Sequence, residues 1–256
     1  MPWLRALIVL PFGLAVGSFL TVVIHRMPEK ESVIRPRSRC PGCGAELANR
    51  DNIPVVSWLL LRGKCRTCGM RISAVYPLTE LATGALFASA GWHFRDPLVI
   101  VEMCVFLALM PAVIVIDVRH KIIPNALTYP ALIFFPALVV AAWALGAPLD
   151  PLRAGLGFLA YGGGVLLVAL VSGGMGMGDV KLAGVIGVVL GGLGLRFVGV
   201  AAALAILLGG LGAVAALTRG AGRKSAIPFG PYLAAGAMVA AFVGGPIAAA
   251  YLRSFS

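Results

Sequence analysis

Long runs of apolar residues, separated by short polar loops, recur along almost the whole chain. Most of the runs cover about 18 to 22 residues, which is close to the length that an α-helix needs to cross the hydrocarbon core of a bilayer. The sixth, near residues 179–193, is shorter and rich in glycine. The pattern predicts about eight transmembrane helices, at residues 3–24, 76–93, 97–116, 125–145, 152–172, 179–193, 196–217 and 229–252. We therefore expect an all-α polytopic membrane protein.

One long polar segment interrupts this pattern after the first apolar run, and it contains four of the five cysteines. We expect a first transmembrane helix at residues 1–26, a small inserted domain at 27–75 and a seven-helix membrane domain at 76–256. The first apolar run is interpreted as a retained helix and not as a secretory signal, because it is long, contains two glycines and lacks an AxA-like cleavage site.

Composition and charge agree with a membrane location. Hydrophobic residues make up 60% of the 256 residues and charged residues only 12%, against about 25% charged in an average soluble domain. Of the 21 Lys and Arg residues, 16 fall in loops on one side of the predicted bundle. The positive-inside rule makes that side, with the polar insertion, cytoplasmic and places both termini outside. The net charge of +11 is then explained by orientation and by contact with an anionic lipid bilayer, so we expect no nucleic-acid binding.

The polar insertion carries two paired cysteine motifs. Cys40-Pro-Gly-Cys43 and Cys65-Arg-Thr-Cys68 are separated by 21 residues, near the spacing of a four-thiolate zinc ribbon. Two disulfides are the alternative, but the segment is expected on the reducing side of the membrane. The segment is also too small and polar to be stabilised by an apolar core alone, so it needs a cross-link such as a bound metal ion. We expect structural zinc bound by these four cysteines. Cys104, within the third predicted span, is expected to act as a small apolar residue.

Carboxylates are rare in this chain, and four of the ten lie inside or at the ends of predicted spans, where an ionised acid costs several kcal/mol. Asp117 ends the third span and Asp179 opens the sixth, and the topology places both at the cytoplasmic boundary. The other two are less suited to catalysis. Glu80 lies one turn into its span, and Glu102 lies nearer the outer face, where we expect a structural hydrogen bond.

Two interpretations of the aspartates remain open from the residues alone. Each aspartate can cap its helix or pair with a nearby Lys or Arg. If Asp117 and Asp179 meet, the pair shares one proton and can perform aspartyl protease chemistry. Gly176 and Gly178 would let an extended substrate backbone pass beside Asp179, and Lys181 could tune the ionisation of the pair.

These segments resemble those of the type IV prepilin peptidase family. Gly176-Met-Gly-Asp-Val-Lys181 is similar to the family's GxGDxK motif, and the segment from Asp117 to Asn125 resembles its other aspartate motif. The resemblance extends to the segments 17–20, 51–58 and 227–233, and it therefore covers nearly the whole chain.

The resemblance implies that Asp117 and Asp179 are the catalytic pair of an aspartyl endopeptidase in the bacterial inner membrane. Arg119 and Lys121, which follow Asp117 in the sequence, and Lys181 are candidates for supporting the site and binding the leader. The implied substrates are prepilins or pseudopilins, cut after a glycine between a basic leader and an apolar helix. The cysteine insertion implies the bifunctional bacterial branch, which also N-methylates the new terminus with S-adenosylmethionine. No GxGxxG follows a strand, so the methyl-donor site is not located.

Two other classes of protein fit parts of the sequence. A transporter also uses intramembrane acids and glycine-broken helices, but it predicts a site near the midplane and a repeat between halves, and neither aspartate motif occurs twice. A noncatalytic scaffold would dock a partner through the zinc ribbon and would use the aspartates only as helix caps.

Overall fold

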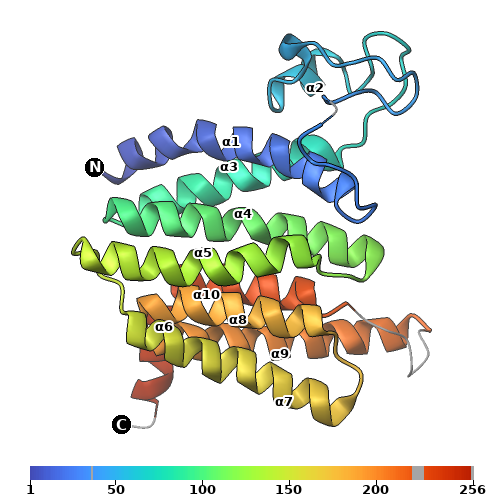
Figure 1. Ribbon diagram of the computed structural model, residues 1–256. Coiled ribbons are helices and arrows are strands. Elements are labelled where there is room, and N and C mark those ends of the chain that lie inside the picture. Colours follow the sequence, from blue (N-terminus) through green and yellow to red (C-terminus); the bar gives the residue numbers. More distant parts are fainter. Residues whose placement is uncertain (36, 221–227, 255–256) are drawn as a thin grey trace. The chain divides into compact units, whose positions relative to one another are not determined.

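The computed structural model describes residues 1–35, 37–220 and 228–254, and in them the regular secondary structure is helical (Figure 1). The long helical segments are α1 (Pro2–Arg26), α3 (Val75–His93), α4 (Pro97–His120), α5 (Asn125–Ala144), α6 (Pro151–Gly157) with its continuation, α8 (Met177–Leu193), α9 (Leu195–Thr218) and α10 (Gly230–Arg253). The continuation of α6 is a π-helical turn, η2 (Phe158–Gly162), followed by α7 (Gly163–Ser172). Each predicted span matches one of these segments to within four residues at either end. The all-α fold is confirmed.

Six helical segments have the length and composition of a membrane span: α1, α4, α5, the segment from α6 to α7, α9 and α10. The other two, α3 and α8, are 19 and 17 residues long and fall outside this set among the described residues. A multi-pass membrane protein is therefore confirmed, and the crossing of the bilayer by α3 and α8 stays a prediction.

The described chain forms two compact units, one of residues 1–95 with 103–112 and the other of residues 96–102 with the chain from 113 onwards. In the first unit α1 packs along α3. A Cβ on Gly17 of α1 would lie 2.7 Å from the Cα of Glu80, so only glycine allows the two backbones to approach this closely. The polar insertion follows α1 and contains two short helices, η1 (Asn49–Asp51) and α2 (Val56–Leu60).

In the second unit α8 is the central helix, and it is contacted by α5, α6, α7, α9 and α10. Every residue from Leu182 to Gly192 is buried. Glycines permit this close packing, because a Cβ on Gly191 would lie 2.6 Å from the carbonyl oxygen of Arg153. α8 is therefore surrounded mainly by protein, which fits its short length and its many small residues.

Candidate functional site

Asp117 lies in the last turn of α4 and is almost completely buried, with 4% of its surface exposed. Lys121 caps this helix in the left-handed conformation, at φ +54°, and donates its N–H to the carbonyl oxygen of Asp117 at 2.8 Å. The carboxyl oxygen Oδ2 of Asp117 accepts a hydrogen bond from the backbone N–H of Gly230, 3.0 Å away. Gly230 is the first residue of α10, so the positive end of that helix is directed at the carboxyl group.

Asp179 lies in the first turn of α8, for which Gly176 is the N-cap residue. A Cβ on Gly176 would lie 3.5 Å from Oδ2 of Asp179, so the missing side chain leaves this side of the carboxyl group uncovered by residue 176. Asp179 is half-buried, and its carboxyl group is close enough to that of Asp117 for the two to interact electrostatically. The structure thus brings the two predicted aspartates together from separate helices.

Ile123 is the residue against which the neighbouring helix ends pack. A Cβ on Gly178 would lie 3.0 Å from the Cβ of Ile123, and a Cβ on Gly230 would lie 3.0 Å from its Cδ1. The first turns of α8 and α10 therefore both contact this buried side chain, which lies in the loop directly after α4. Glycine at both positions allows the starts of α8 and α10 to pack closely against the loop that follows Asp117.

The three predicted basic residues have different surroundings. Lys181 donates to Oδ1 of Asn125 and lies 4.5 Å from the centre of the Tyr129 ring, so its contacts are with α5 rather than with a carboxylate. Arg119 and Lys121 are exposed, and within the described ranges neither forms an ion pair with an aspartate. The aspartates are therefore not neutralised by these neighbours, which removes one of the structural explanations for them.

Two neighbouring carboxyl groups in a partly buried site can perform acid and base steps together. They repel one another when both are ionised, so the pair retains one proton and titrates as a coupled unit. The ionised member can accept a proton while the protonated member donates one. The site is therefore suited to hydrolysis of a peptide bond.

The four paired cysteines of the insertion form one cluster, with all Sγ atoms within 4.8 Å of one another. The Sγ atoms of Cys40 and Cys68 are 3.7 Å apart, close to the separation of about 3.8 Å that tetrahedral zinc with Zn–S bonds of about 2.3 Å imposes. All four are free thiols rather than disulfides. The residues present fit a four-thiolate zinc site.

The two cysteine turns share one backbone pattern. In each, the N–H of the first cysteine donates to the carbonyl five residues on, and a glycine N–H donates back to that cysteine's carbonyl, at 2.8 to 3.0 Å. The glycines, Gly44 and Gly69, have φ values of +69° and +71°, which glycine adopts without strain. Amide groups of Cys68 and Thr67 hydrogen-bond the sulfur of Cys65 and lower the pKa of Cys65 to about 6. These amide groups favour the thiolate form of Cys65, which is the form that binds a metal ion.

The segment between the cysteine turns is attached to α3 through Glu80. Val55 has φ +62°, which is unusual for a β-branched residue, and its N–H donates to Oε2 of the buried Glu80 at 2.7 Å. Arg66 of the second turn forms an ion pair with Asp51 at 2.6 Å, and this hydrogen bond lowers the pKa of Asp51. The motif at 51–58 therefore links the cysteine cluster to α3.

Sequence reasoning missed several of these contacts. It assigned no role to Gly230 or Ile123, although both lie inside or beside the quoted motifs, and it did not identify Asn125 as the partner of Lys181. The structural hydrogen bond expected for Glu102 is absent, since neither of its carboxyl oxygens has a partner among the described residues. Ile227, the first residue of the quoted segment 227–233, lies outside the described residues.

The chain matches known protein families and characterised relatives over most of its length. Two family models match it: the bacterial peptidase A24 N-terminal domain over residues 11–94, and the type IV leader peptidase family over residues 104–216. A prepilin leader peptidase/N-methyltransferase of Bacillus subtilis is 40% identical over 246 residues, which cover 94% of this chain and 96% of that protein. Proteins with the same name from Stutzerimonas stutzeri and Pseudomonas aeruginosa are 36% and 34% identical, covering 98% and 94% of this chain and 95% and 91% of their own lengths. No solved structure gives a significant match.

The fold and the site define a polytopic helical membrane protein with a carboxyl pair at the meeting point of helix ends and a four-cysteine cluster after the first helix. The chain belongs to the type IV leader peptidase family. Together with the six apolar segments, this membership makes it a multi-pass inner-membrane protein, and the resemblance expected from the motifs is confirmed.

Proposed function

We propose that this chain is a membrane aspartyl endopeptidase that removes the basic leader from type IV prepilins or pseudopilins and then N-methylates the new N-terminal residue. The observation that carries the proposal is the meeting of Asp117 and Asp179 beside Ile123. The substrate class and the second activity come from the names of the relatives, which the chain matches over nearly its whole length.

In the proposed reaction, the ionised carboxylate of the pair accepts a proton from water as the water oxygen attacks the scissile carbonyl carbon. The protonated partner hydrogen-bonds the carbonyl oxygen and later donates its proton to the amine as the C–N bond breaks. The products are a leader with a new carboxyl group and a mature protein with a free α-amine. The N–H of Gly230 occupies Oδ2 of Asp117, which leaves Oδ1 for the water or for Asp179.

The glycines around Asp179 support an extended substrate beside it. Gly176 is exposed, and it has no side chain that would cover the carboxyl group of Asp179. Gly178 packs on Ile123 and so keeps the first turn of α8 close to Asp117. We assign Gly176 to substrate passage and Gly178 to packing. We assign Lys181 to positioning the first turn of α8 against α5, because its side chain contacts Asn125 and Tyr129.

We place the site and the four-cysteine domain, residues 27–75, on the cytoplasmic side of the membrane. The support is the charge bias of the loops, since 16 of the 21 Lys and Arg residues fall on that side. Arg119 and Lys121, both exposed after Asp117, would then face the anionic lipid headgroups of the inner leaflet. A membrane-held precursor presents the junction between its leader and its apolar helix at the same depth.

The proposal includes two cofactors, zinc and S-adenosylmethionine. Cys40, Cys43, Cys65 and Cys68 would hold zinc in a structural role, because four thiolates leave no open coordination position. S-adenosylmethionine supplies the methyl group in the second reaction. We assign no residues to the methyl donor.

The proposal is tested by incubating the purified protein with a purified prepilin in detergent and analysing the products by mass spectrometry. We expect a single cut between the basic leader and the apolar helix. On addition of S-adenosylmethionine, we expect the mature product to gain the mass of one methyl group. An uncut prepilin would contradict the peptidase, and a cut product that never gains this mass would contradict only the methyl transfer.

A further inference from the structure

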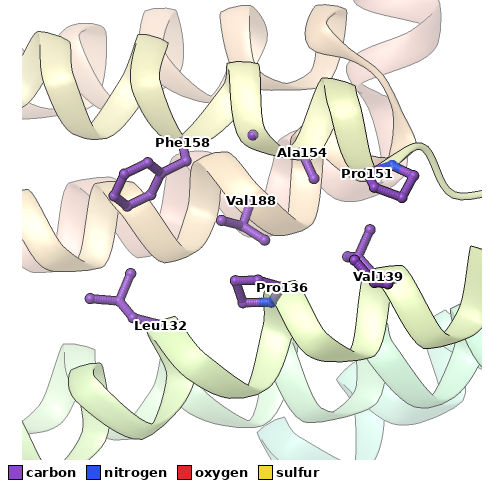
Figure 2. Close-up of a pocket in the computed structure, with 9 residues that line it drawn as sticks. Leu132, Pro136, Val139, Pro151, Ala154, Phe158 and Val188 are labelled. Atoms are coloured by element: carbon purple, nitrogen blue, oxygen red, sulfur yellow. The ribbon is translucent and has the colours of Figure 1, made fainter.

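An apolar groove of about 330 Å³ lies between α5 and α6, with α8 at its base. Figure 2 shows side chains of the two outer helices facing each other across the groove, with Val188 between them. Every residue that lines it is apolar. The lining consists of Leu132, Pro136, Val139, Val140, Pro151, Ala154, Gly155, Phe158 and Val188.

The groove leads away from the carboxyl pair along α8. At its near end, a Cβ on Gly184 would lie 2.9 Å from the Phe158 ring and 3.5 Å from the Leu132 side chain. Gly184 follows Asp179 by five residues and Val188 follows it by nine, which are about 7.5 Å and about 13.5 Å along a helix. The lining therefore begins little more than one helical turn beyond the site.

Both walls of the groove contain a departure from regular α-helix. In α5, Pro136 has no N–H to donate to the carbonyl of Leu132, which faces the same groove. In the opposite wall, Phe158 begins the π-helical turn η2, a type of irregularity that is frequent at functional sites. Gly184 leaves the space that the Phe158 ring fills. Specific local features thus shape the groove.

We propose that this groove binds bulky apolar side chains of the substrate's own membrane helix, downstream of the scissile bond. The inference rests on the proposed function, in which that helix directly follows the cut and must run from the carboxyl pair into the bilayer. At about 1.5 Å per residue, the groove lies level with about the fifth to ninth residues after the scissile bond. Binding there would hold the scissile carbonyl at the aspartates by means of a remote contact.

Gly155 offers a direct way to fill the groove. It lines the groove and is exposed, and a Cβ there would meet nothing within 4 Å, so the backbone at Gly155 has room for a side chain and Gly155→Leu is the substitution of choice. Gly199→Leu in α9 is the matched control, because Gly199 is also an exposed helical glycine with open space and lies outside the lining.

Assays with two substrates distinguish an effect on binding in the groove from an effect on cleavage of the peptide bond. One is a full prepilin with its apolar helix, and the other is a short peptide that ends a few residues after the scissile bond. We expect Gly155→Leu to lower kcat/KM on the full prepilin by about tenfold, mainly through KM, and to leave the short peptide unaffected. Gly199→Leu should match wild type on both. An unchanged rate on the prepilin, or an equal loss on both substrates, would overturn the groove proposal, whereas failure of wild type on the prepilin would overturn the proposed function.

Photo-crosslinking gives an independent measurement. A benzoylphenylalanine at position 140, in the groove, should crosslink to the apolar helix of prepilin bound to an Asp179→Asn protein. The same group at Ile133, a neighbouring α5 residue that is 75% exposed and outside the lining, should do so much less. Crosslinks from position 140 to lipid alone would overturn the proposal and would identify the groove as an acyl-chain site.

Discussion

Gly230 donates its backbone N–H to the carboxyl oxygen Oδ2 of Asp117 over 3.0 Å. The bond joins the end of α4 to the start of α10, and it gives a partner to one of the amides that a helix leaves unpaired at its N-terminus. It also fixes the orientation of the carboxyl group. The geometry of the proposed catalytic pair therefore depends on a backbone group.

Gly230→Ala should damage the site directly. The added Cβ would lie 2.6 Å from Oδ2 of Asp117 and 3.0 Å from Cδ1 of Ile123, so the carboxyl group must move. We expect prepilin cleavage to fall by about 100-fold, since displacements on the order of 1 Å can cost that much. Gly210→Ala in α9, where a Cβ meets open space, is the control and should cleave normally. A near-normal rate for Gly230→Ala would show that Asp117 needs no fixed orientation.

The contact between Lys181 and Asn125 is expected to position the first turn of α8. Lys181→Met and Asn125→Ala should each lower cleavage by loosening the link between Asp179 and α5. Because they remove one shared contact, the double variant should lose little more than either single variant, with a coupling energy of about 0.5 to 3 kcal/mol. Rates of the three variants measure this cycle. Fully additive losses would mean that the two residues act separately.

Cys40→Ser should release zinc from the cytoplasmic domain, because three thiolates bind the ion less well than four. We expect methyl transfer to suffer more than cleavage, since the cysteine domain is separate in sequence from both aspartates. Metal analysis of the purified protein and the two activity assays provide the measurement. Cys104→Ser, outside the cluster, is the control. Wild-type protein purified without any zinc would contradict the metal assignment.

Glu80 should stabilise the segment between the cysteine turns. Glu80→Leu removes the acceptor for the Val55 N–H and should destabilise this segment by about 1 to 3 kcal/mol. Glu80→Gln keeps an acceptor oxygen and should have a smaller effect. Amide hydrogen exchange of residues 49–60 compares the two. Equal protection in wild type and Glu80→Leu would remove this role.

The sequence predicted the helices well because the thickness of the bilayer dictates the length of each span. The charges of the loops led to the expectation that Asp117 and Asp179 lie at the same membrane boundary, and the structure brings the two residues close together. The sequence could not predict the Gly230 contact, since a backbone donor leaves no side-chain signal. The partner of Lys181 on α5 likewise depends on how two helices pack, and no local pattern reveals this packing.

In the cysteine domain, the sequence predicted the cluster but not how the segment between the two turns is attached. The spacing of Cys40, Cys43, Cys65 and Cys68 was sufficient to predict one four-thiolate cluster. The attachment of the intervening segment to Glu80 was not predictable, because it requires Val55 to adopt a conformation that its residue type disfavours. Tertiary contacts override local preference there.

Asp117 and Asp179 are proposed to act as one proton-sharing pair, and prepilin cleavage by wild type, Asp117→Asn and Asp179→Asn tests this pairing. The amide side chains preserve size but cannot exchange the proton. We expect both variants to insert into the membrane and to retain zinc, yet to leave the prepilin uncut. Normal cleavage by either variant would contradict the pairing.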